Sequence, residues 1–317
     1  MRIVILSRSP SLYSTSRLTL AARARGHEVR VIDPLEVQIV VRSSGRPALC
    51  VTGAALSKVD LVIPRIGASI SNYGLTVVRQ FDLMGVPVLN GAVAIARSRD
   101  KLRSLQLLTR KKIPVPTTVC ARSPGAVPDA LKLVGGCPAI VKLQQGSQGI
   151  GTMIAETPQA VASLLETLWA MGQDIILQQY IRESKGRDVR AIVVGGRIVA
   201  AMRRTAKAGE FRSNLHRGGF GLGVDLKQPY RQTAIAAAKA MALEVAGVDM
   251  VETRTGPRVL EINSSPGLEG IERASGVNVA TAIIEHAEKL VSRRSWRVCK
   301  DAVVDYERST TRLRGAI

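Results

Sequence analysis

Residues 248–263 read VDMVETRTGPRVLEIN, and this stretch decides the fold of the carboxyl-terminal half of the chain. Two runs that alternate apolar and polar residues flank a Gly-Pro turn, which predicts a β-hairpin. If the turn centres on Thr255, Asp249 lies directly opposite Glu261 on the neighbouring strand. Asn263 joins them on the same face, because side chains repeat every two residues along a strand. The stretch therefore predicts three oxygen-bearing side chains on one face of a sheet.

This triad has two interpretations. Oxygen ligands with few charges suit Mg²⁺ that is shared with the phosphates of a nucleotide. The alternative is that Asp249 and Asn263 merely end strands, as these residue types often do. The apolar residue between each pair of polar ones and the closing register favour the metal site.

A second motif, KLQQGSQGIG at residues 142–151, follows a predicted strand. Three glycines, Gly146, Gly149 and Gly151, allow backbone N–H groups to approach phosphate oxygens, and Lys142 can pair with a phosphate as a point charge. A nucleotide-binding P-loop would open a helix next, whereas residues 152–155 read as a strand. We therefore predict a hairpin lid, although a plain turn fits the isolated motif equally well.

Two further segments carry polar side chains where strands end. At residues 178–181 (QQYI) a strand edge offers backbone groups to an adenine, and Asp188 follows at a distance that suits a ribose diol; taken alone, a solvated strand end fits better. The loop FRSNLHRGG at 211–219 presents Arg212 as a planar fork for phosphate and Asn214 as a carbonyl for a metal. His216 in the same loop is more typical of a structural histidine.

Composition bounds the function. The 317 residues carry 45 Lys and Arg against 25 Asp and Glu, a net charge of +20, which attracts nucleic acid, anionic lipid or an acidic protein. Aromatic residues make up only 3%, which is thin for stacking single-stranded bases. The four cysteines form no paired motif, which indicates reduced thiols in a cytoplasmic protein. No signal peptide or membrane span is expected.

The chain divides into regions of different pattern. Alternating strands and helices over residues 1–92 predict a parallel, helix-covered α/β sheet. Beyond them, strands joined by tight turns predict two α+β lobes, and basic residues fill a tail, 293–317. The expected strands are 3–6, 28–32, 61–63, 87–89, 117–121, 139–143, 152–155, 175–180, 189–194, 197–202, 248–252 and 258–262. The expected helices are 12–25, 75–84, 99–112, 230–246 and 277–292, and residues 41–52 are expected to form an exposed loop or hairpin.

Taken together and in this order, the segments resemble the ATP-grasp superfamily, and within it the RimK family. The resemblance rests on LSR at 6–8, IPRIG at 63–67, AIAR at 94–97, DKLRS at 100–104, the FRSNLHRGG loop and EINSSPGLEG at 261–270. It covers residues 1–292 and implies an N-terminal pre-ATP-grasp domain (1–95), a central ATP-grasp lobe with the glycine-rich lid (96–182) and a C-terminal lobe with the metal site (183–292). The basic tail lies outside it.

The family resemblance also implies a reaction. RimK ligases use ATP and Mg²⁺ (two ions, with Mn²⁺ able to substitute) to add glutamate to the C-terminus of ribosomal small-subunit protein six. A terminal carboxylate attacks the γ-phosphate to give an acyl phosphate and ADP, and the amine of glutamate then displaces phosphate. The partners implied are the acidic tail of the ribosomal protein, free glutamate and other copies of the chain, with a weak RNA contact through the basic tail.

Residue by residue, the resemblance assigns roles along the chain. Arg204 and Arg212 are implied to be catalytic, and Arg65, Asn72 and Tyr73 to hold the acidic acceptor. Nucleotide contacts are implied for Lys101, Lys142, Gly146, Gly149, Gly151, Gln179, Tyr180, Asp188, Arg212, Ser213 and Asn214. Mg²⁺ ligands are implied for Asp249, Glu261 and Asn263.

Four positions depart from the family pattern. Gln145 and Gln179 stand where Glu is usual, and Arg203 and Thr205 flank Arg204 where the family reads Glu-Arg-Arg. Changes on that strand put amino-acid specificity or rate in question. Two other functions stay open: a related ATP-grasp ligase for a cofactor or an amino-group carrier protein, and a non-catalytic basic protein that binds RNA.

Overall fold

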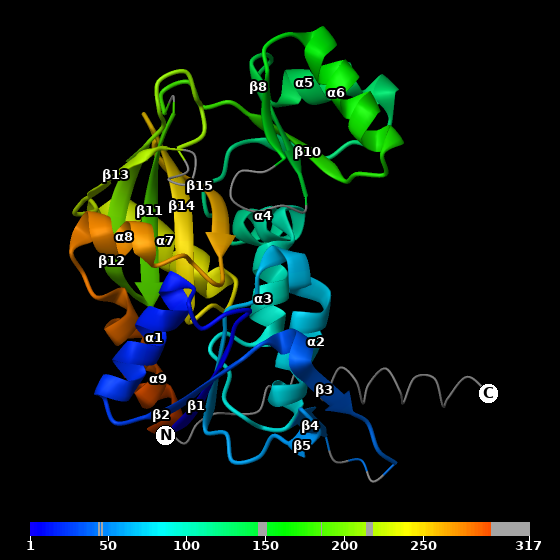
Figure 1. The fold of residues 1–317 in the computed structure, drawn as a ribbon. Helices are drawn as coiled ribbons and strands as arrows, with labels where there is room; N and C mark the ends of the chain where they lie inside the picture. The colour runs from blue at the N-terminus through cyan, green and yellow to red at the C-terminus, as the bar shows by residue number, and fades with distance from the viewer. Residues whose placement is uncertain (44, 46, 145–150, 185, 214–217, 293–317) are drawn as a thin grey trace. The chain divides into compact units, whose positions relative to one another are not determined.

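The computed structural model describes residues 1–43, 45, 47–144, 151–184, 186–213 and 218–292. They fall into two compact units. Of the described residues, the first comprises Met1–Ile66, Ile70–Ala92 and Ile284–Ser292, and the second comprises Gly67–Ser69 and Val93–Ile283. Figure 1 shows both units, with the chain coloured from its N-terminus to its C-terminus.

The first unit contains the predicted parallel sheet. Its strands lie in the order β2 (Glu28–Ile32), β1 (Arg2–Leu6) and β6 (Leu61–Pro64), and both pairs are parallel. Residues 3–6 are fully buried, as expected for a strand with neighbours on both sides and a helix cover. The expected strand 87–89 is reduced to one parallel bridge between Val62 and Val88. The helices are α1 (Tyr13–Ala24) and α2 (Ser71–Leu83).

Residues 37–55 form a small antiparallel sheet rather than a loop. Its strands are β3 (Val37–Val40), β4 (Ala48–Val51) and β5 (Ala54–Ala55), so the hairpin alternative is confirmed. Helix α1 ends where Gly26 adopts a left-handed conformation (φ +76°), which a residue with a Cβ atom rarely takes.

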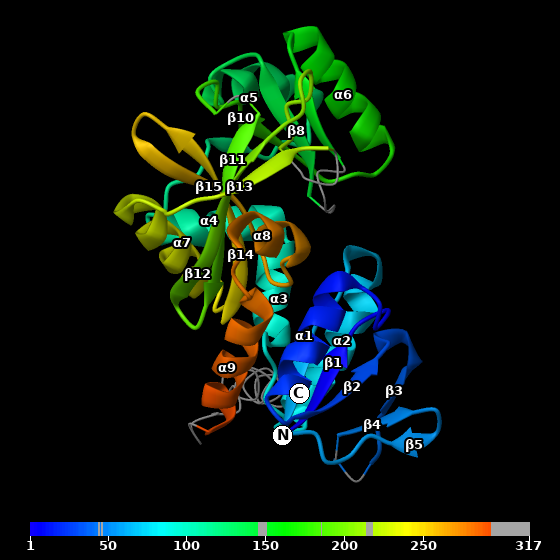
Figure 2. The same cartoon turned by 60° about the vertical axis from the view of Figure 1, so that its left-hand side comes forward.

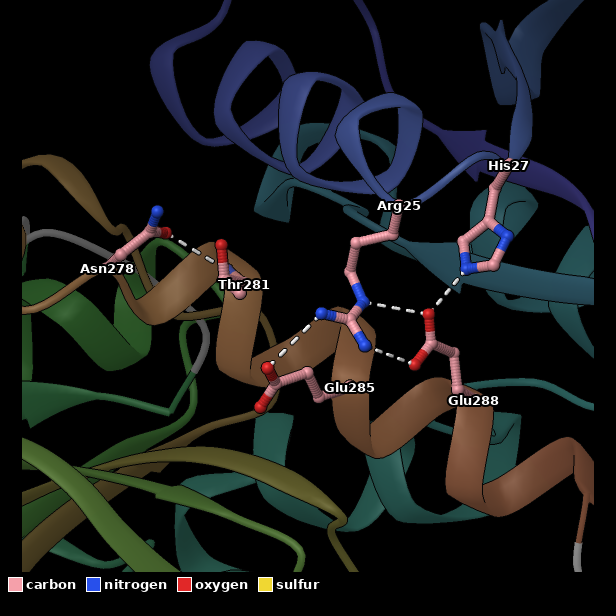
Figure 3. A network of polar contacts seen from close by, with 6 residues as sticks. All are labelled: Arg25, His27, Asn278, Thr281, Glu285 and Glu288. Atoms are coloured by element: carbon pink, nitrogen blue, oxygen red, sulfur yellow. Dashed lines mark hydrogen bonds and ion pairs between the residues drawn. The ribbon is translucent and has the colours of Figure 1, made fainter.

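The end of the last helix, α9 (Val279–Ser292), belongs to the first unit. Figure 3 shows Glu288 between Arg25 and His27: its carboxylate accepts from Nε and Nη2 of Arg25 at 2.8 and 2.7 Å and lies 2.8 Å from Nε2 of His27. Glu285 adds a longer contact of 3.3 Å to Arg25. The hydrogen bond from Arg25 holds the pKa of Glu288 at about 2. These contacts fasten α9 to the turn between α1 and β2.

The second unit begins with a four-stranded antiparallel sheet in the order β7-β10-β8-β9. The strands are β7 (Thr118–Val119), β10 (Ile175–Gln179), β8 (Ala139–Leu143) and β9 (Thr152–Ala155). Helices α5 (Val127–Leu133) and α6 (Pro158–Ala170) cover one face, where Val141, Val161 and Leu177 join a buried cluster (Figure 1). The other face carries Lys142 and Gln178 together with the buried Ile140 and Ile176.

A five-stranded antiparallel sheet follows, in the order β13-β12-β11-β14-β15. The strands are β13 (Phe220–Gly223), β12 (Arg197–Thr205), β11 (Arg187–Val194), β14 (Val245–Thr253) and β15 (Gly256–Asn263). Helix α7 (Gln228–Ala240) packs its alanines against the odd-numbered residues of β11, such as Val189 and Ala191. Helix α8 (Glu269–Ser275) lies against the other face near β12 and β13, where a Cβ atom on Gly223 would come within 2.6 Å of the Ala274 carbonyl (Figure 2).

Helix boundaries differ from expectation in several places, and α2 begins at Ser71 rather than at residue 75. The helix expected over 230–246 ends at Ala240, because Ala242 turns left-handed (φ +58°) and β14 already begins at Val245. The helix expected over 99–112 is α4 (Lys101–Arg110), and Asp100 caps it by accepting from the N–H of Arg103; the helix before it, α3 (Ala92–Arg99), was not expected. Within the described residues, every helix is too short or too polar to cross a membrane.

Candidate active site

The predicted hairpin is formed by β14 and β15, and its register pairs Asp249 with Glu261 and Gly247 with Asn263. The expected facing of Asp249 and Glu261 is confirmed, but the turn centre was predicted wrongly. The strands join at the pair Thr253–Gly256, half a residue earlier than expected, and a bulge next to Asp249 restores the register. Only the three-dimensional structure reveals this bulge, which aims the carboxylates together.

The donor set of this face fits a hard cation. Nδ2 of Asn263 donates to Oε1 of Glu261 at 3.2 Å, so the amide oxygen of Asn263 stays available. Asp249 and Glu261 are direct register partners across the hairpin. Two carboxylates and one amide, with all donor atoms oxygen, are the ligands that Mg²⁺ prefers. Groups of three or more His, Cys, Asp or Glu with metal-binding geometry do not occur among the described residues, because the third member here is an asparagine.

Two arginines surround Asp249. Arg190, directly opposite it on β11, donates from Nε and Nη2 to the two carboxylate oxygens, both at 2.6 Å, and Arg204 approaches to 3.0 Å. The Asp249 side chain is only 3% exposed. Burial alone would raise the pKa of Asp249, but the charges of Arg190 and Arg204 outweigh it and hold that pKa well below its usual range. Sequence analysis assigned no role to Arg190, because only the pairing of β11 with β14 places it beside Asp249.

Asp188 and Arg204 form a second buried ion pair. They face each other across the β11–β12 hairpin, and both carboxylate oxygens of Asp188 accept from Arg204, from Nε at 2.7 Å and from Nη2. Burial opposes the charge on Arg204, yet Asp249 and Asp188 together raise its pKa. Asp188, for which a ribose contact is predicted, therefore also holds Arg204 in place.

Two lysines face this acidic group. Lys142, on β8, is partly buried, and burial lowers its pKa to about 8 although Glu261 and Asp249 attract its charge. Burial also lowers the pKa of Lys101, the first residue of α4, which donates to the carbonyls of Leu143 and Gln144 at 3.0 and 3.4 Å. Lys101 therefore joins the start of α4 to the end of β8, next to the predicted lid.

The predicted adenine segment ends β10. The N–H of Gln179 donates to the Thr117 carbonyl at 2.8 Å, and its side-chain oxygen accepts from Nη1 of Arg258 at 2.9 Å. Tyr180 follows the strand and is partly buried. Gln178 has a side chain that is only 1% exposed, and it contacts Lys142. Sequence analysis placed Gln178 in the predicted adenine segment through its backbone only and gave its side chain no role.

Arg212 lies within the loop that follows β12. Its Nε and Nη2 donate to the two oxygens of Glu210 at 3.0 and 2.7 Å, and its guanidinium lies 5.2 Å from the ring centre of Phe211. The hydrogen bond from Arg212 lowers the pKa of Glu210 to about 2. Nη1 of Arg212 also reaches the Thr152 carbonyl on β9 at 3.4 Å, and the neighbouring Ser213 is buried. The loop and the lid hairpin are therefore in contact.

Several expected residues cannot be placed. Gly146, Gly149, Asn214, the departure at Gln145 and the basic tail 293–317 all lie outside the described residues. The strands that flank the glycine-rich segment do pair antiparallel, as a hairpin requires. Gly151 is left-handed (φ +74°), and a Cβ atom there would meet Leu143 at 2.7 Å, so only glycine fits.

The three residues expected to hold the acceptor belong to the first unit. Arg65 follows β6, and burial lowers its pKa to about 10. Asn72 and Tyr73 lie in the first turn of α2. The hydroxyl of Tyr73 donates to the Val37 carbonyl at 2.6 Å, which fastens α2 to β3. A substrate role for Tyr73 would have to use its ring or break this bond.

The departures at Arg203 and Thr205 point away from the acidic group. Arg203 donates to Glu252 at 3.1 and 3.2 Å, on the side of the sheet that α7 covers. Alternation puts Thr205 on that same side and Arg204 on the opposite one. These two departures therefore leave the face with Asp188, Asp249 and Glu261 unchanged.

Comparison with known proteins identifies the family. Residues 1–95 match the RimK pre-ATP-grasp domain and residues 98–287 match the RimK-like ATP-grasp domain. The chain belongs to the RimK family of ATP-grasp ligases. Curated relatives include the probable alpha-L-glutamate ligase 1 of Shewanella denitrificans, 53% identical over 91% of this chain and 98% of that protein. Another, the probable alpha-L-glutamate ligase of Ectopseudomonas mendocina, is 52% identical over 91% of this chain and 96% of its own length.

Solved structures share the fold. The ATP-grasp ligase PsnB, in complex with a minimal precursor, Mg and ADP, has a TM-score of 0.71 at 22% identity and covers 92% of this chain and 98% of that one. The RimK domain protein of Sphaerobacter thermophilus has a TM-score of 0.66 at 23% identity and covers 90% and 99%. The ATP-grasp architecture with an N-terminal parallel-sheet domain, expected from the sequence, is therefore confirmed, and the chain is an ATP-grasp ligase that forms a C–N bond.

Proposed function

We propose that this chain is an ATP-dependent glutamate ligase that adds glutamate residues to the C-terminus of a ribosomal small-subunit protein. The naming of relatives more than 50% identical as probable alpha-L-glutamate ligases supports the amino acid. The observation that carries the chemistry is the single sheet face on which Asp249, Glu261 and Asn263 meet the cations Arg190 and Arg204. The ribosomal acceptor rests on the resemblance of the RimK motifs.

The reaction we propose has two steps. The terminal carboxylate of the acceptor attacks the γ-phosphorus of ATP, so that an acyl–oxygen–phosphorus bond forms and ADP leaves. The α-amine of glutamate then attacks the acyl carbon, a C–N bond forms, phosphate leaves and the amine loses a proton. Both steps gather negative charge on oxygen atoms, so positioned cations can lower the barrier without a protein nucleophile.

The residues divide this work. Asp249, Glu261 and Asn263 would hold the metal, which would neutralise charge on the transferring phosphoryl oxygens when bound. Lys142 from the four-stranded sheet and Lys101 from the start of α4 would contact the nucleotide, and their lowered pKa values reflect a site partly shielded from water. For the arginines, Arg204 would keep the Asp249 carboxylate oriented and carry positive charge next to the phosphates.

Arg212 would reach phosphate through Nη1, because Glu210 engages Nε and Nη2 and Nη1 makes only a 3.4 Å contact with the Thr152 carbonyl. Gln179 and Tyr180 would hold the adenine and Asp188 the ribose. Arg65 and α2 would contribute to acceptor binding. The two-ion count, substitution by Mn²⁺, the oligomeric state, the cytoplasmic location and an RNA contact of the tail stay predictions.

A mass measurement tests the proposal. The full chain is incubated with Mg-ATP and glutamate, with and without a peptide that ends in the C-terminal residues of the ribosomal protein, and ADP and intact peptide mass are followed. A ladder in glutamate-residue steps that requires ATP supports both acceptor and amino acid. ADP release at the same rate with and without the peptide would indicate another acceptor. A folded protein that releases no ADP with any acceptor would favour a non-catalytic binding protein.

A further inference from the structure

A chain of hydrogen bonds ends on the Lys142 ammonium. Nζ of Lys142 donates to Oε1 of Gln178 at 2.7 Å, and Nε2 of Gln178 donates to Oγ1 of Thr118 at 2.8 Å. The hydroxyl of Thr118 donates in turn to the Pro116 carbonyl at 3.0 Å. Gln178 lies directly opposite Thr118 on the neighbouring strand, so the two side chains share the face that carries Lys142.

The chemistry of the three groups allows the hydrogen bonds to run in one direction only. An ammonium group has donors and no acceptor, so the amide of Gln178 must turn its oxygen toward Lys142. Its NH₂ group then faces Thr118, whose own proton is used on the Pro116 carbonyl. Because the Gln178 side chain is buried, the opposite orientation would leave polar groups unsatisfied. The amide is therefore fixed at both ends.

Lys142 needs such an anchor because other charges act on it. Glu261 and Asp249 attract its ammonium, while Lys101 repels it. A lysine stem has four carbons and is flexible, so an unanchored ammonium can move toward the carboxylates. A move onto Glu261 would consume the charge of a group that the proposed metal requires.

We propose that Gln178 is a positioning residue: its carbonyl holds the Lys142 ammonium on the nucleotide side of the site and keeps it from pairing with Glu261, and Thr118 fixes the orientation of the Gln178 amide. This inference rests on the proposed role of Lys142 in nucleotide binding. It assigns a task to a buried glutamine and a threonine that the sequence motifs left without one.

A double-mutant cycle tests the coupling. Binding of Mg-ADP to the full chain is measured by calorimetry for the wild type, Gln178→Met, Lys142→Met and the double variant. Since a hydrogen bond to a charged group is lost, we expect Gln178→Met to weaken binding roughly tenfold in the wild type and less than about twofold when Lys142 is already Met. A tenfold loss in both backgrounds would overturn the inference, because Gln178 would then act without Lys142. If Lys142→Met binds Mg-ADP as the wild type does, the proposed nucleotide role of Lys142 fails instead, and the inference with it.

Conservative variants supply the matched controls. Gln178→Glu retains an acceptor for Lys142, and the Thr118 hydroxyl can turn its proton toward the new carboxylate, so we expect Mg-ADP affinity within about threefold of the wild type. Thr118→Val should weaken binding severalfold, and Thr118→Ser should restore it. Equal losses in Gln178→Glu and Gln178→Met, with unchanged melting temperatures of the unliganded proteins, would refute positioning by the carbonyl. If Gln178→Met fails to fold, the Thr118 variants decide the question, because a Thr118→Val that binds Mg-ADP as tightly as the wild type would overturn the inference.

Discussion

Arg203 and Arg204 are adjacent on β12 and form similar two-pronged ion pairs, but they lie on opposite faces of the sheet. Arg203 pairs with Glu252 on the α7 side, and its side chain is 43% exposed. Arg204 pairs with Asp188 and contacts Asp249, and its side chain is 4% exposed. The same chemistry has different consequences, because water screens the first pair and not the second. Burial, rather than pairing, distinguishes the face that carries the proposed site.

The largest effect is expected from the acidic group itself. Glu261→Ala removes a charged oxygen ligand, and we expect turnover to fall by at least about a thousandfold, because phosphoryl transfer depends on electrostatic stabilisation. ADP release checks this, and the melting temperature of the unliganded protein should change little. The matched control is Glu252→Ala on the opposite face, which should keep near-normal turnover. A comparable loss of turnover in both variants would contradict the proposal that only one face of the sheet carries the site.

Removal of each arginine compares the two faces in stability. Arg204→Met leaves the buried Asp188 carboxylate without its partner, while Arg190 still pairs with Asp249, and we expect a loss of about 3–5 kcal/mol in the free energy of unfolding. Arg203→Met removes a half-exposed pair and should cost at most about 1 kcal/mol. Urea unfolding of the two variants beside the wild type measures the difference. If their midpoints shift equally, burial is not what separates the pairs.

The pH dependence of folding stability tests whether Lys142 is shielded from water. The pKa of Lys142 is lowered from 10.5 to about 8, so between these values the unfolded chain binds more protons than the folded one. Folding stability should therefore rise with pH across this window in the wild type and not in Lys142→Met. Melting temperatures of both proteins at pH 7.5 and 9.5 check the sign, and an identical pH response of the two would contradict the shift.

The smallest effect is expected in the first unit, for the ion pair between Arg25 and Glu288. Its side chains are partly exposed to water, as those of the Arg203–Glu252 pair are. The pKa of Glu288 is lowered from 4.5 to about 2 by the hydrogen bond from Arg25, so its stabilisation is present above pH 4.5 and disappears as the pH falls toward 2. Glu288→Gln should cost about 1 kcal/mol or less near pH 7, a gap that closes in acid. Unfolding of Glu288→Gln and of the control Glu285→Gln, which loses one longer contact, would measure it; a cost that persists at pH 2 would assign the effect to packing.

Much of the fold followed from local pattern. Hydrophobic alternation and turn residues predicted the parallel sheet, the lid strands and the hairpin that pairs Asp249 with Glu261, since these signals act between neighbours in the chain. The end of α7 was predicted wrongly because the alanine-rich run continues past Ala240, whereas the backbone turns left-handed at Ala242 and β14 begins at Val245. Helix propensity depends on local sequence, so it could not predict that β14, which pairs with strands distant in the sequence, begins there.

The sequence by itself determined the motifs, their order and the family they resemble. Tertiary structure decided which of their side chains meet. The pairing of Arg190 with Asp249 depends on strands separated by 59 residues in sequence, and the contact of Lys142 with Gln178 on strands 36 residues apart. Such pairs follow from sheet order, which non-local packing sets and which no local period encodes. The different burial of Arg203 and Arg204 is also a tertiary effect. Alternation along the strand predicts that the two side chains lie on opposite faces of the sheet. Only the packing of α7 and the burial of Asp249 decide which face each side chain occupies.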